Sequence, residues 1–285
     1  MAIQNALTVD VEDYFHVSAF AKSINHKDWD NHPLRVEKNT LRLLDLFGEV
    51  QVKATFFVLG WVADRNRNLI KEIAARGHEV ACHGYSHQLI YNQTQEVFRE
   101  ETIRSKKLLE DIIQAPVRGY RAASYSITKD SLWALDILAE AGFVYDSSIF
   151  PIRHDRYGMP DAKEVPHILK TPQGHSLVEF PLSTAKIFNY KLPVAGGGYF
   201  RLYPYILTRA GLRQVNSHQQ PFIFYLHPWE IDPDQPTIEA GWFSRFRHYN
   251  NLEKCESRLQ RLMKDFRFDT AWQVLNSLGL AESSQ

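Results

Sequence analysis

Short apolar runs alternate with segments of helical periodicity along most of the chain. The apolar runs are typical of buried β-strands and lie at residues 6–9, 52–59, 79–82, 118–120, 143–145, 177–180 and 222–226. Between them, apolar residues recur every three or four positions at 36–47, 63–76, 95–113 and 129–141, which predicts amphipathic helices. Strands separated by helices of this length pair in parallel through right-handed crossovers. The pattern therefore predicts an α/β fold, a (β/α) barrel of about seven parallel strands with its active site at the C-terminal strand ends.

The stretch at 151–204 departs from this pattern, because it is rich in Pro, Gly, His and Tyr. We expect one short strand there within long inserted loops, and an ordered loop at Gly196–Arg201 whose backbone approaches a ligand closely. Residues 249–266 predict a further amphipathic helix, followed by a segment at 269–278. We find no internal repeat and no linker. The expected organisation is one domain over 1–285, with a core at 5–232, an insertion at about 151–204 and a C-terminal helical segment at about 245–280.

Composition narrows the class of protein. Lys plus Arg and Asp plus Glu each number 33, so the net charge gives no indication of a nucleic-acid partner or an acidic membrane surface. Two cysteines, Cys82 and Cys255, make no disulfide framework and are consistent with a reducing compartment. The first residues lack a basic segment followed by an apolar one, and no run of ~18 apolar residues occurs. We therefore expect a cytoplasmic protein without a transmembrane segment.

Polar side chains that could take part in catalysis or metal binding follow five of the predicted strands. They are Asp10, Glu12 and Asp13 after the first strand, His83 and His87 after the third, Arg121 after the fourth, Asp146 after the fifth and His227 after the seventh. Two imidazoles and a carboxylate would make a three-ligand metal site with an open position for water. A His-x-x-x-His pair alone is equally typical of surface or core histidines. Its place after a strand, beside a glycine that permits a sharp turn, favours the metal site.

Three motifs carry a resemblance to a known family. Residues 53–60 (KATFFVLG), 77–80 (GHEV) and 83–87 (HGYSH) resemble the NodB-type polysaccharide deacetylases, carbohydrate esterase family 4. The resemblance implies a distorted, incomplete (β/α) barrel that removes N-acetyl groups from amino sugars with a divalent metal. Residues 9–15, 196–201 and 225–230 resemble a narrower branch, the deacetylases of exosortase-linked (PEP-CTERM) exopolysaccharide loci, which is related to allantoinase-like members.

The resemblance implies a ligand set for the metal. His83 and His87 would bind it, with Zn expected first and Co, Fe or Ni also suited to such ligands. The family's usual carboxylate ligand directly follows the catalytic base, but Val11 stands there. In the allantoinase-like branch the ligand falls two residues after the base, which selects Glu12, and residues two apart on a strand share a face. Asp13 remains the alternative to Glu12.

The resemblance also implies catalytic roles. Asp10 would be the general base, and Arg121 would orient it and lower its pKa. His227 would be the general acid toward the leaving amine. Asp146 is expected either to orient His227 or to form a turn.

Further residues are candidates for contacts with the substrate. Tyr125 is expected to offer its backbone N–H to the oxyanion, and its loop lacks the proline of the family's Arg-x-Pro motif because Ala123 stands there, which puts the rigidity of the loop in question. The candidates for sugar contacts are Tyr199, Arg201, Trp229 and Glu230.

The function expected from the sequence is metal-dependent N-deacetylation of an amino-sugar polysaccharide, or of its lipid- or nucleotide-linked precursor, in exopolysaccharide biosynthesis. The partner is therefore an N-acetylated glycan. Two alternatives stay open, an allantoinase-like cyclic amide hydrolase and a catalytically inactive carbohydrate-binding protein. The sequence leaves the sugar and the oligomeric state undetermined.

Overall fold

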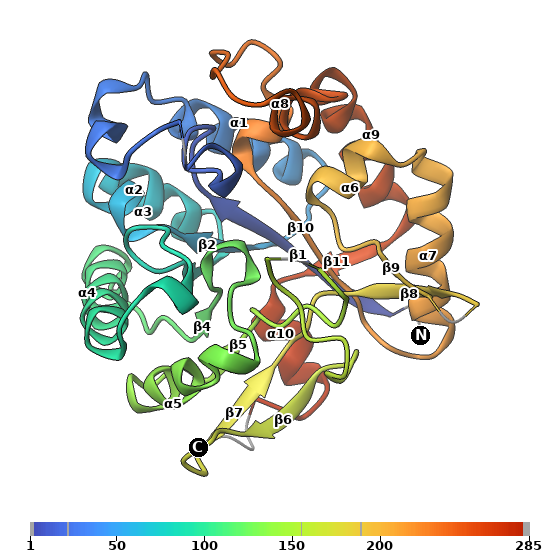
Figure 1. Cartoon of the computed structure of the whole chain (residues 1–285). Helices are drawn as coiled ribbons and strands as arrows, with labels where there is room; N and C mark the ends of the chain where they lie inside the picture. The colour runs from blue at the N-terminus through green and yellow to red at the C-terminus, as the bar shows by residue number, and fades with distance from the viewer. Residues whose placement is uncertain (1–2, 22, 155, 189, 282–285) are drawn as a thin grey trace.

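A twisted, mostly parallel sheet runs through the molecule (Figure 1), in a computed structural model that describes residues 3–21, 23–154, 156–188 and 190–281. Its strand order is β10-β1-β2-β3-β4-β5-β7-β6, with β11 paired to the start of β1. Only β6 pairs antiparallel within the described sheet. The bounds are β1 Gln4–Val11, β2 Thr55–Val58, β3 Glu79–Cys82, β4 Gly119–Tyr120, β5 Tyr145–Asp146, β6 His167–Lys170, β7 Ser176–Glu179, β10 Ile223–Leu226 and β11 Arg267–Asp269. All seven expected strands are present, so the α/β fold is confirmed.

The barrel is incomplete, because β7 and β10 are joined by irregular chain instead of a strand ladder. Residues 181–188 and 190–196 cross the gap: Ile223 N donates to Ser183 Oγ (2.9 Å) and Tyr225 N donates to Ala195 O (2.7 Å). The separate hairpin of β8 (Thr184–Ile187) and β9 (Tyr190–Pro193) belongs to this crossing segment. The opening gives the distorted form of barrel that the sequence motifs implied.

Helices surround the sheet, most of them packed on its outer face and the last of them inside the barrel. They are α1 Val36–Glu49, α2 Gly60–Arg65, α3 Arg67–Ala75, α4 Gln95–Ile113, α5 Trp133–Glu140, α6 Gly197–Leu202, α7 Tyr205–Ser217, α8 Trp242–Tyr249, α9 Leu252–Asp265 and α10 Ala271–Ser277. Short 3₁₀ turns lie at Ser18–Phe20, His26–Asn31, Ile90–Asn92, Ala123–Tyr125, Lys129–Ser131 and Pro228–Ile231. No helix of the described ranges is long and apolar enough to cross a membrane.

Two cores pack on the two faces of the strands. Leu7, Val9 and Val11 of β1 face the larger core between the sheet and its helices, whereas Ala6 belongs to the smaller core inside the barrel. Because side chains alternate along a strand, Thr8 and Asp10 share the inner face with Ala6. The helix α10 contributes Ala271, Val274 and Leu275 to the same inner core, near the start of β1 (Figure 1). Packing at the N-terminal strand ends leaves the C-terminal ends for the site.

Several expectations for the helices and for the second half of the chain were wrong. The helix expected at 63–76 is divided into α2 and α3, because Asn66 leaves the helical region (φ −131°, ψ 48°). Residues 151–204 hold β6, β7, β8 and β9, not one short strand. The helix expected at 249–266 is interrupted at Asn250 and Asn251, and residues 267–269 form β11.

The glycine run, expected as an ordered loop, is instead the start of a helix. Helix α6 begins at Gly197, and the backbone that approaches Gly196 is that of Tyr225 in β10. Gly196 has φ +127°, and a Cβ there would overlap the carbonyl of Tyr225. The glycines therefore allow α6 to pack closely against β10.

Candidate active site

The carboxylate of Glu12 and the imidazoles of His83 and His87 meet at the C-terminal end of the sheet. One ligand atom from each residue lies within 4.8 Å of the other two. Glu12 follows β1, His83 follows β3, and Gly84 (φ +72°) turns the chain so that His87 returns toward the same point. Glu12 Oε2 lies 2.8 Å from His87 Nε2. This buried set of two nitrogens and one carboxylate is a three-ligand arrangement of the kind that holds Zn²⁺ in catalytic sites.

The environment prepares these groups for a cation. His83 Nδ1–H donates to the carbonyl of Arg121 (2.8 Å), which leaves Nε2 as the free lone pair. Burial lowers the pKa of His83 to about 4, so the ring is neutral at neutral pH. Burial alone would raise the pKa of Glu12, but the charges and hydrogen bonding of His87, with His227, hold it well below its usual range. A charged carboxylate and a neutral imidazole are the ligand forms a divalent metal needs.

Asp13, the alternative ligand, is used elsewhere. Its Oδ2 accepts from the backbone N–H groups of Arg35 (2.7 Å) and Val36 (2.8 Å), and its Oδ1 accepts from Tyr14 N (2.9 Å). Asp13 therefore caps the N-terminus of α1 from a distant part of the chain. The structure places Glu12, and not Asp13, beside the two histidines.

Asp10 is held by a fully buried arginine. Arg121 Nη1 donates to Asp10 Oδ1 (2.6 Å) and to Thr8 Oγ1 (2.8 Å), while its Nε and Nη2 donate to Ser147. The guanidinium also lies over the Phe57 ring at 4.0 Å. With every face of Arg121 engaged, the carboxylate of Asp10 is fixed on the inner wall of the barrel.

His227 begins a buried chain of charges. Its Nδ1 lies 2.7 Å from Glu230 Oε1, and Glu230 Oε2 accepts from Arg201 Nε at 2.6 Å. The Pro228 that follows starts a 3₁₀ turn, and Glu230 Oε1 also accepts from His227 N (3.1 Å) as in a capping box. The spacing His-Pro-Trp-Glu therefore fixes the ring of His227.

The charges along this chain shift the pKa values in opposite directions. Burial alone would lower the pKa of His227, but the hydrogen bond to Glu230 and the charge of Glu12 raise it to about 9. For Glu230, burial is outweighed by Arg201 and His227, which lower its pKa to about 2. The remaining nitrogen of His227, Nε2, lies 3.3 Å from Glu12 Oε1 and 3.9 Å from Asp10 Oδ2. His227 thus presents a protonated Nε2 to the same space as Asp10 and Glu12.

Arg201 and Glu230 were expected to contact the sugar, and the structure gives them other partners. Besides Glu230, Arg201 donates to the carbonyls of Arg247, His248 and Asn250. All three guanidinium nitrogens are therefore occupied, and Glu230 is fully buried. The pair contacts and orients His227, which was one of the two roles expected of Asp146.

Asp146 lies in β5 on a different network. Its carboxylate accepts from Ser148 N (3.1 Å) and Ser148 Oγ (2.6 Å). Burial raises the pKa values of both Asp146 and Glu179, and the charge of Asp146 raises that of Glu179 further. The contacts of Asp146 are those of the expected turn former.

Tyr125 differs from its expected geometry. Its backbone N–H donates to Ala122 O (3.1 Å), so in this conformation that N–H is already satisfied. Both Ser124 and Tyr125 have positive φ (51° and 55°), and this turn aims the Tyr125 hydroxyl at Asp10 Oδ2 (3.5 Å). Although the family's proline is missing, the loop is tied down, since Ala122 N donates to Ser148 Oγ (2.8 Å).

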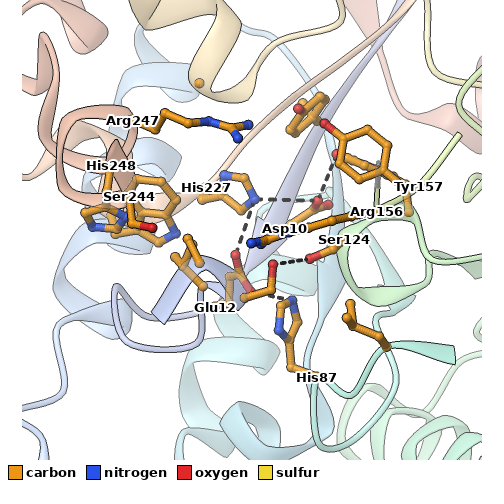
Figure 2. A pocket seen from close by; sticks show the side chains of 18 of the residues that line it. Asp10, Glu12, His87, Ser124, Arg156, Tyr157, His227, Ser244, Arg247 and His248 are labelled. Atoms are coloured by element: carbon orange, nitrogen blue, oxygen red, sulfur yellow. Dashed lines mark hydrogen bonds and ion pairs between the residues drawn. The ribbon is translucent and has the colours of Figure 1, made fainter. Parts of the chain in front are cut away.

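These groups line one cavity, shown in Figure 2. Asp10, Glu12, His83, His87 and His227 form its floor, with Tyr125 and Trp229 on the walls. The ring of Trp229 is stacked between His227 (5.0 Å) and His248 (4.2 Å), and its Nε1 is buried without a hydrogen-bond acceptor among the described residues. Tyr199 lines an adjoining hollow with Tyr157 and Arg247.

Sequence reasoning missed residues that the loops bring to this cavity. They are Ser18, Ser124, His154, Arg156, Tyr157, Ser244, Arg247 and His248. They lie on loops, on 3₁₀ turns and on α8, and no pattern in these segments indicates that they reach the strand ends. The capping spacing of His227 and Glu230 was the one signal in the sequence that could have revealed their pairing.

Two family models match successive parts of the chain. Residues 27–145 match the polysaccharide deacetylase family, and residues 147–276 match a domain of unknown function, DUF3473. The peptidoglycan-N-acetylglucosamine deacetylase of Bacillus cereus is 31% identical over 98 residues, which are 34% of this chain and 36% of the relative. The match thus spans about a third of the length of the first curated relatives.

Solved structures extend the likeness over nearly the whole chain. A proposed polysaccharide deacetylase from Mycobacterium smegmatis superposes with a TM-score of 0.65 at 20% identity, covering 99% of this chain and 91% of the other. Puue allantoinase gives 0.59 at 14% identity, covering 96% and 89%. These likenesses show a shared fold. The family model adds a sequence likeness to polysaccharide deacetylases over residues 27–145.

Proposed function

We propose that the protein is a metal-dependent deacetylase. It would remove N-acetyl groups from amino sugars of a polysaccharide, or of its lipid- or nucleotide-linked precursor, in exopolysaccharide biosynthesis. The observation that carries this proposal is the convergence of Glu12, His83 and His87 with two separately anchored groups, Asp10 and His227. The printed name of the Bacillus cereus relative, a deacetylase of an N-acetylated glycan, supports the substrate class.

The donor set fits a divalent cation. Glu12, His83 and His87 would hold it, and two imidazoles with one carboxylate suit Zn first and also Co, Fe or Ni. When bound, such an ion lowers the pKa of a water molecule and polarises a carbonyl.

The chain's own residues would then move the protons of amide hydrolysis. Asp10, held in place by Arg121, accepts the proton of the attacking water. His227, protonated through its contact with Glu230, gives a proton from Nε2 to the departing amine. His227 Nε2 and Asp10 Oδ2 lie 3.9 Å apart, so the proposed acid and the proposed base would both lie next to the same amide group.

The walls of the cavity suit a sugar. The Tyr125 hydroxyl reaches toward Asp10, and the buried Nε1 of Trp229 lacks an acceptor that a sugar hydroxyl would supply. Tyr199, in the adjoining hollow, offers an aromatic face to a neighbouring ring. Arg201 and Glu230 would act on the substrate only through His227.

Acetate release from a panel of N-acetylated oligosaccharides tests the proposal. The protein would be loaded with Zn²⁺ or Co²⁺, with allantoin as a further substrate. We expect acetate from the glycans, and loss of both bound metal and activity in His83→Ala. His175→Ala, at a half-exposed histidine in the β6–β7 turn, is the matched control. Hydrolysis of allantoin alone would support the cyclic amide hydrolase, and absence of metal and turnover would support a carbohydrate-binding protein.

Three finer expectations stay predictions. The cytoplasmic location is tested by cell fractionation, and detection outside the inner membrane would contradict it. The exosortase-linked branch is tested by deleting the gene and measuring acetylation of the exopolysaccharide. The single domain over 1–285 is tested by calorimetry, where it predicts one unfolding transition.

A further inference from the structure

Two arginines at the mouth of the cavity have no acidic partner among the described residues. Three arginines line the cavity: Arg156, Arg201 and Arg247. Arg201 is neutralised by Glu230 and buried (1% exposed), whereas Arg156 and Arg247 are exposed. The Arg247 guanidinium lies over the ring of Phe243, 5.6 Å from the ring centroid.

The negative charges of the cavity are already committed. Among its described lining residues, the acids are Asp10 and Glu12. Asp10 is bound by Arg121, and Glu12 is surrounded by the imidazoles of His87 and His227. A divalent cation on Glu12 would leave the cavity with an excess of positive charge. The charge of Arg156 and Arg247 therefore has no acidic counterpart among the residues that the structure describes.

The two arginines stand on different flanks of the site. Arg156, from the loop between β5 and β6, also lines a larger hollow that continues past His87 along the segment 15–29. Arg247, from α8, also lines the hollow of Tyr157 and Tyr199 on another side. Figure 2 shows both side chains among those that line the cavity around Asp10, Glu12 and His227. A glycan whose acetamido sugar reaches Glu12 would extend its neighbouring groups toward one or both arginines.

We propose that the substrate is an anionic glycan, and that Arg156 and Arg247 bind phosphate or carboxylate groups next to the acetamido sugar. A guanidinium presents a planar fork of donors that matches both of these anions. The proposal rests on the proposed deacetylase function and refines its substrate class. It also assigns a role in substrate binding to residues 147–276, because both arginines belong to this region.

The test compares three oligosaccharides of equal length: a neutral N-acetylglucosamine oligomer, one in which glucuronic acid alternates with N-acetylglucosamine, and one carrying a phosphate on the reducing sugar. For each, kcat/KM is measured at low and high salt with wild type, Arg156→Gln and Arg247→Gln. Arg153→Gln and Arg245→Gln are matched controls, because Arg153 and Arg245 are exposed neighbours outside the cavity lining. Calorimetric binding of the same oligosaccharides to the metal-free protein gives a readout that does not need activity.

Wild type should prefer at least one anionic oligosaccharide, and the phosphate and carboxylate arms identify which anion is used. The ratio of anionic to neutral kcat/KM should fall about threefold to tenfold in each cavity variant, as for a charge-assisted contact near solvent. High salt should reduce the preference, and both control variants should keep the wild-type ratio. Equal treatment of neutral and anionic glycans by wild type, or an unchanged ratio in both variants, would overturn the proposal while leaving the deacetylase intact. No turnover with any glycan, together with arginine-dependent anion binding, would instead overturn the deacetylase and keep the anion site.

Discussion

Replacing Glu230 by Gln should lower the pKa of His227. The Glu230 carboxylate lies 2.7 Å from His227 Nδ1 and is fully buried, so solvent screens the pair little. The amide keeps one acceptor oxygen but loses the charge. It also cannot accept from both His227 and Arg201 as the two carboxylate oxygens do.

The expected shift follows from the values of the pair. The pKa of His227 is raised to about 9 from an ordinary 6.5, and the hydrogen bond to Glu230 is the largest of the contributions that raise it. We expect the pKa of His227 to be about one to two units lower in the variant than in wild type. Each pKa unit corresponds to ~1.4 kcal/mol. A general acid acts in its protonated form, so a lower pKa moves the basic limb of the pH–rate profile to lower pH. At pH 8 the protonated fraction of His227 falls about twofold to tenfold for such a shift, and we expect kcat to fall by the same factor.

The assay is an NMR titration of the histidine ring protons in the metal-free protein, because a cation on Glu12 would itself lower the pKa of His227. The pH–rate profile of the metal-loaded enzyme is measured in parallel. Asp146→Asn is the matched control, since Asp146 is bonded to Ser148. It should leave the titration of His227 near 9. An unchanged pKa in Glu230→Gln, or a shift in Asp146→Asn alone, would refute the assignment of Glu230 as the positioning group.

Further predictions separate ligands from structural residues. Glu12→Gln should lose bound metal in elemental analysis and keep its thermal stability. Asp13→Ala should retain metal, and its free energy of unfolding should fall by about 2 kcal/mol, because three backbone N–H groups are left without an acceptor. Equal metal loss in both variants would reopen the choice of ligand. Gly196→Ala should lower the free energy of unfolding in urea by about 3 kcal/mol or prevent folding, since its φ of +127° is strained for alanine and its Cβ would overlap the Tyr225 backbone. A loss below about 1 kcal/mol would contradict the close packing of α6 on β10.

The sheet was predictable from the sequence because parallel strands are buried on both faces. Residues 56–59 and 222–226 form continuous apolar runs, and the segments that contain them became β2 and β10. The hairpin of β8 and β9 was missed since it lies outside the central sheet and mixes apolar residues with lysines. Its pattern carries no signal of burial.

The candidate site was predictable only as far as strand ends determine it. Residues placed directly after strands, such as Glu12 and His83, converged as expected. The pairing of Glu230 with His227 depended on a 3₁₀ cap, and the places of Arg156 and Arg247 beside the cavity depended on three-dimensional contacts. These are tertiary properties that no local pattern encodes.

The position of β10 has a consequence for how the protein acquires its activity. This strand lies beside β1, although more than 200 residues separate them along the chain. The proposed metal ligands all precede residue 88, but the proposed acid is built only when His227 and Glu230 have been synthesised and β10 has docked. A nascent chain could therefore bind a cation well before it could turn over a substrate. Contacts of such long sequence separation form slowly, so the acquisition of activity should lag behind the acquisition of metal during refolding.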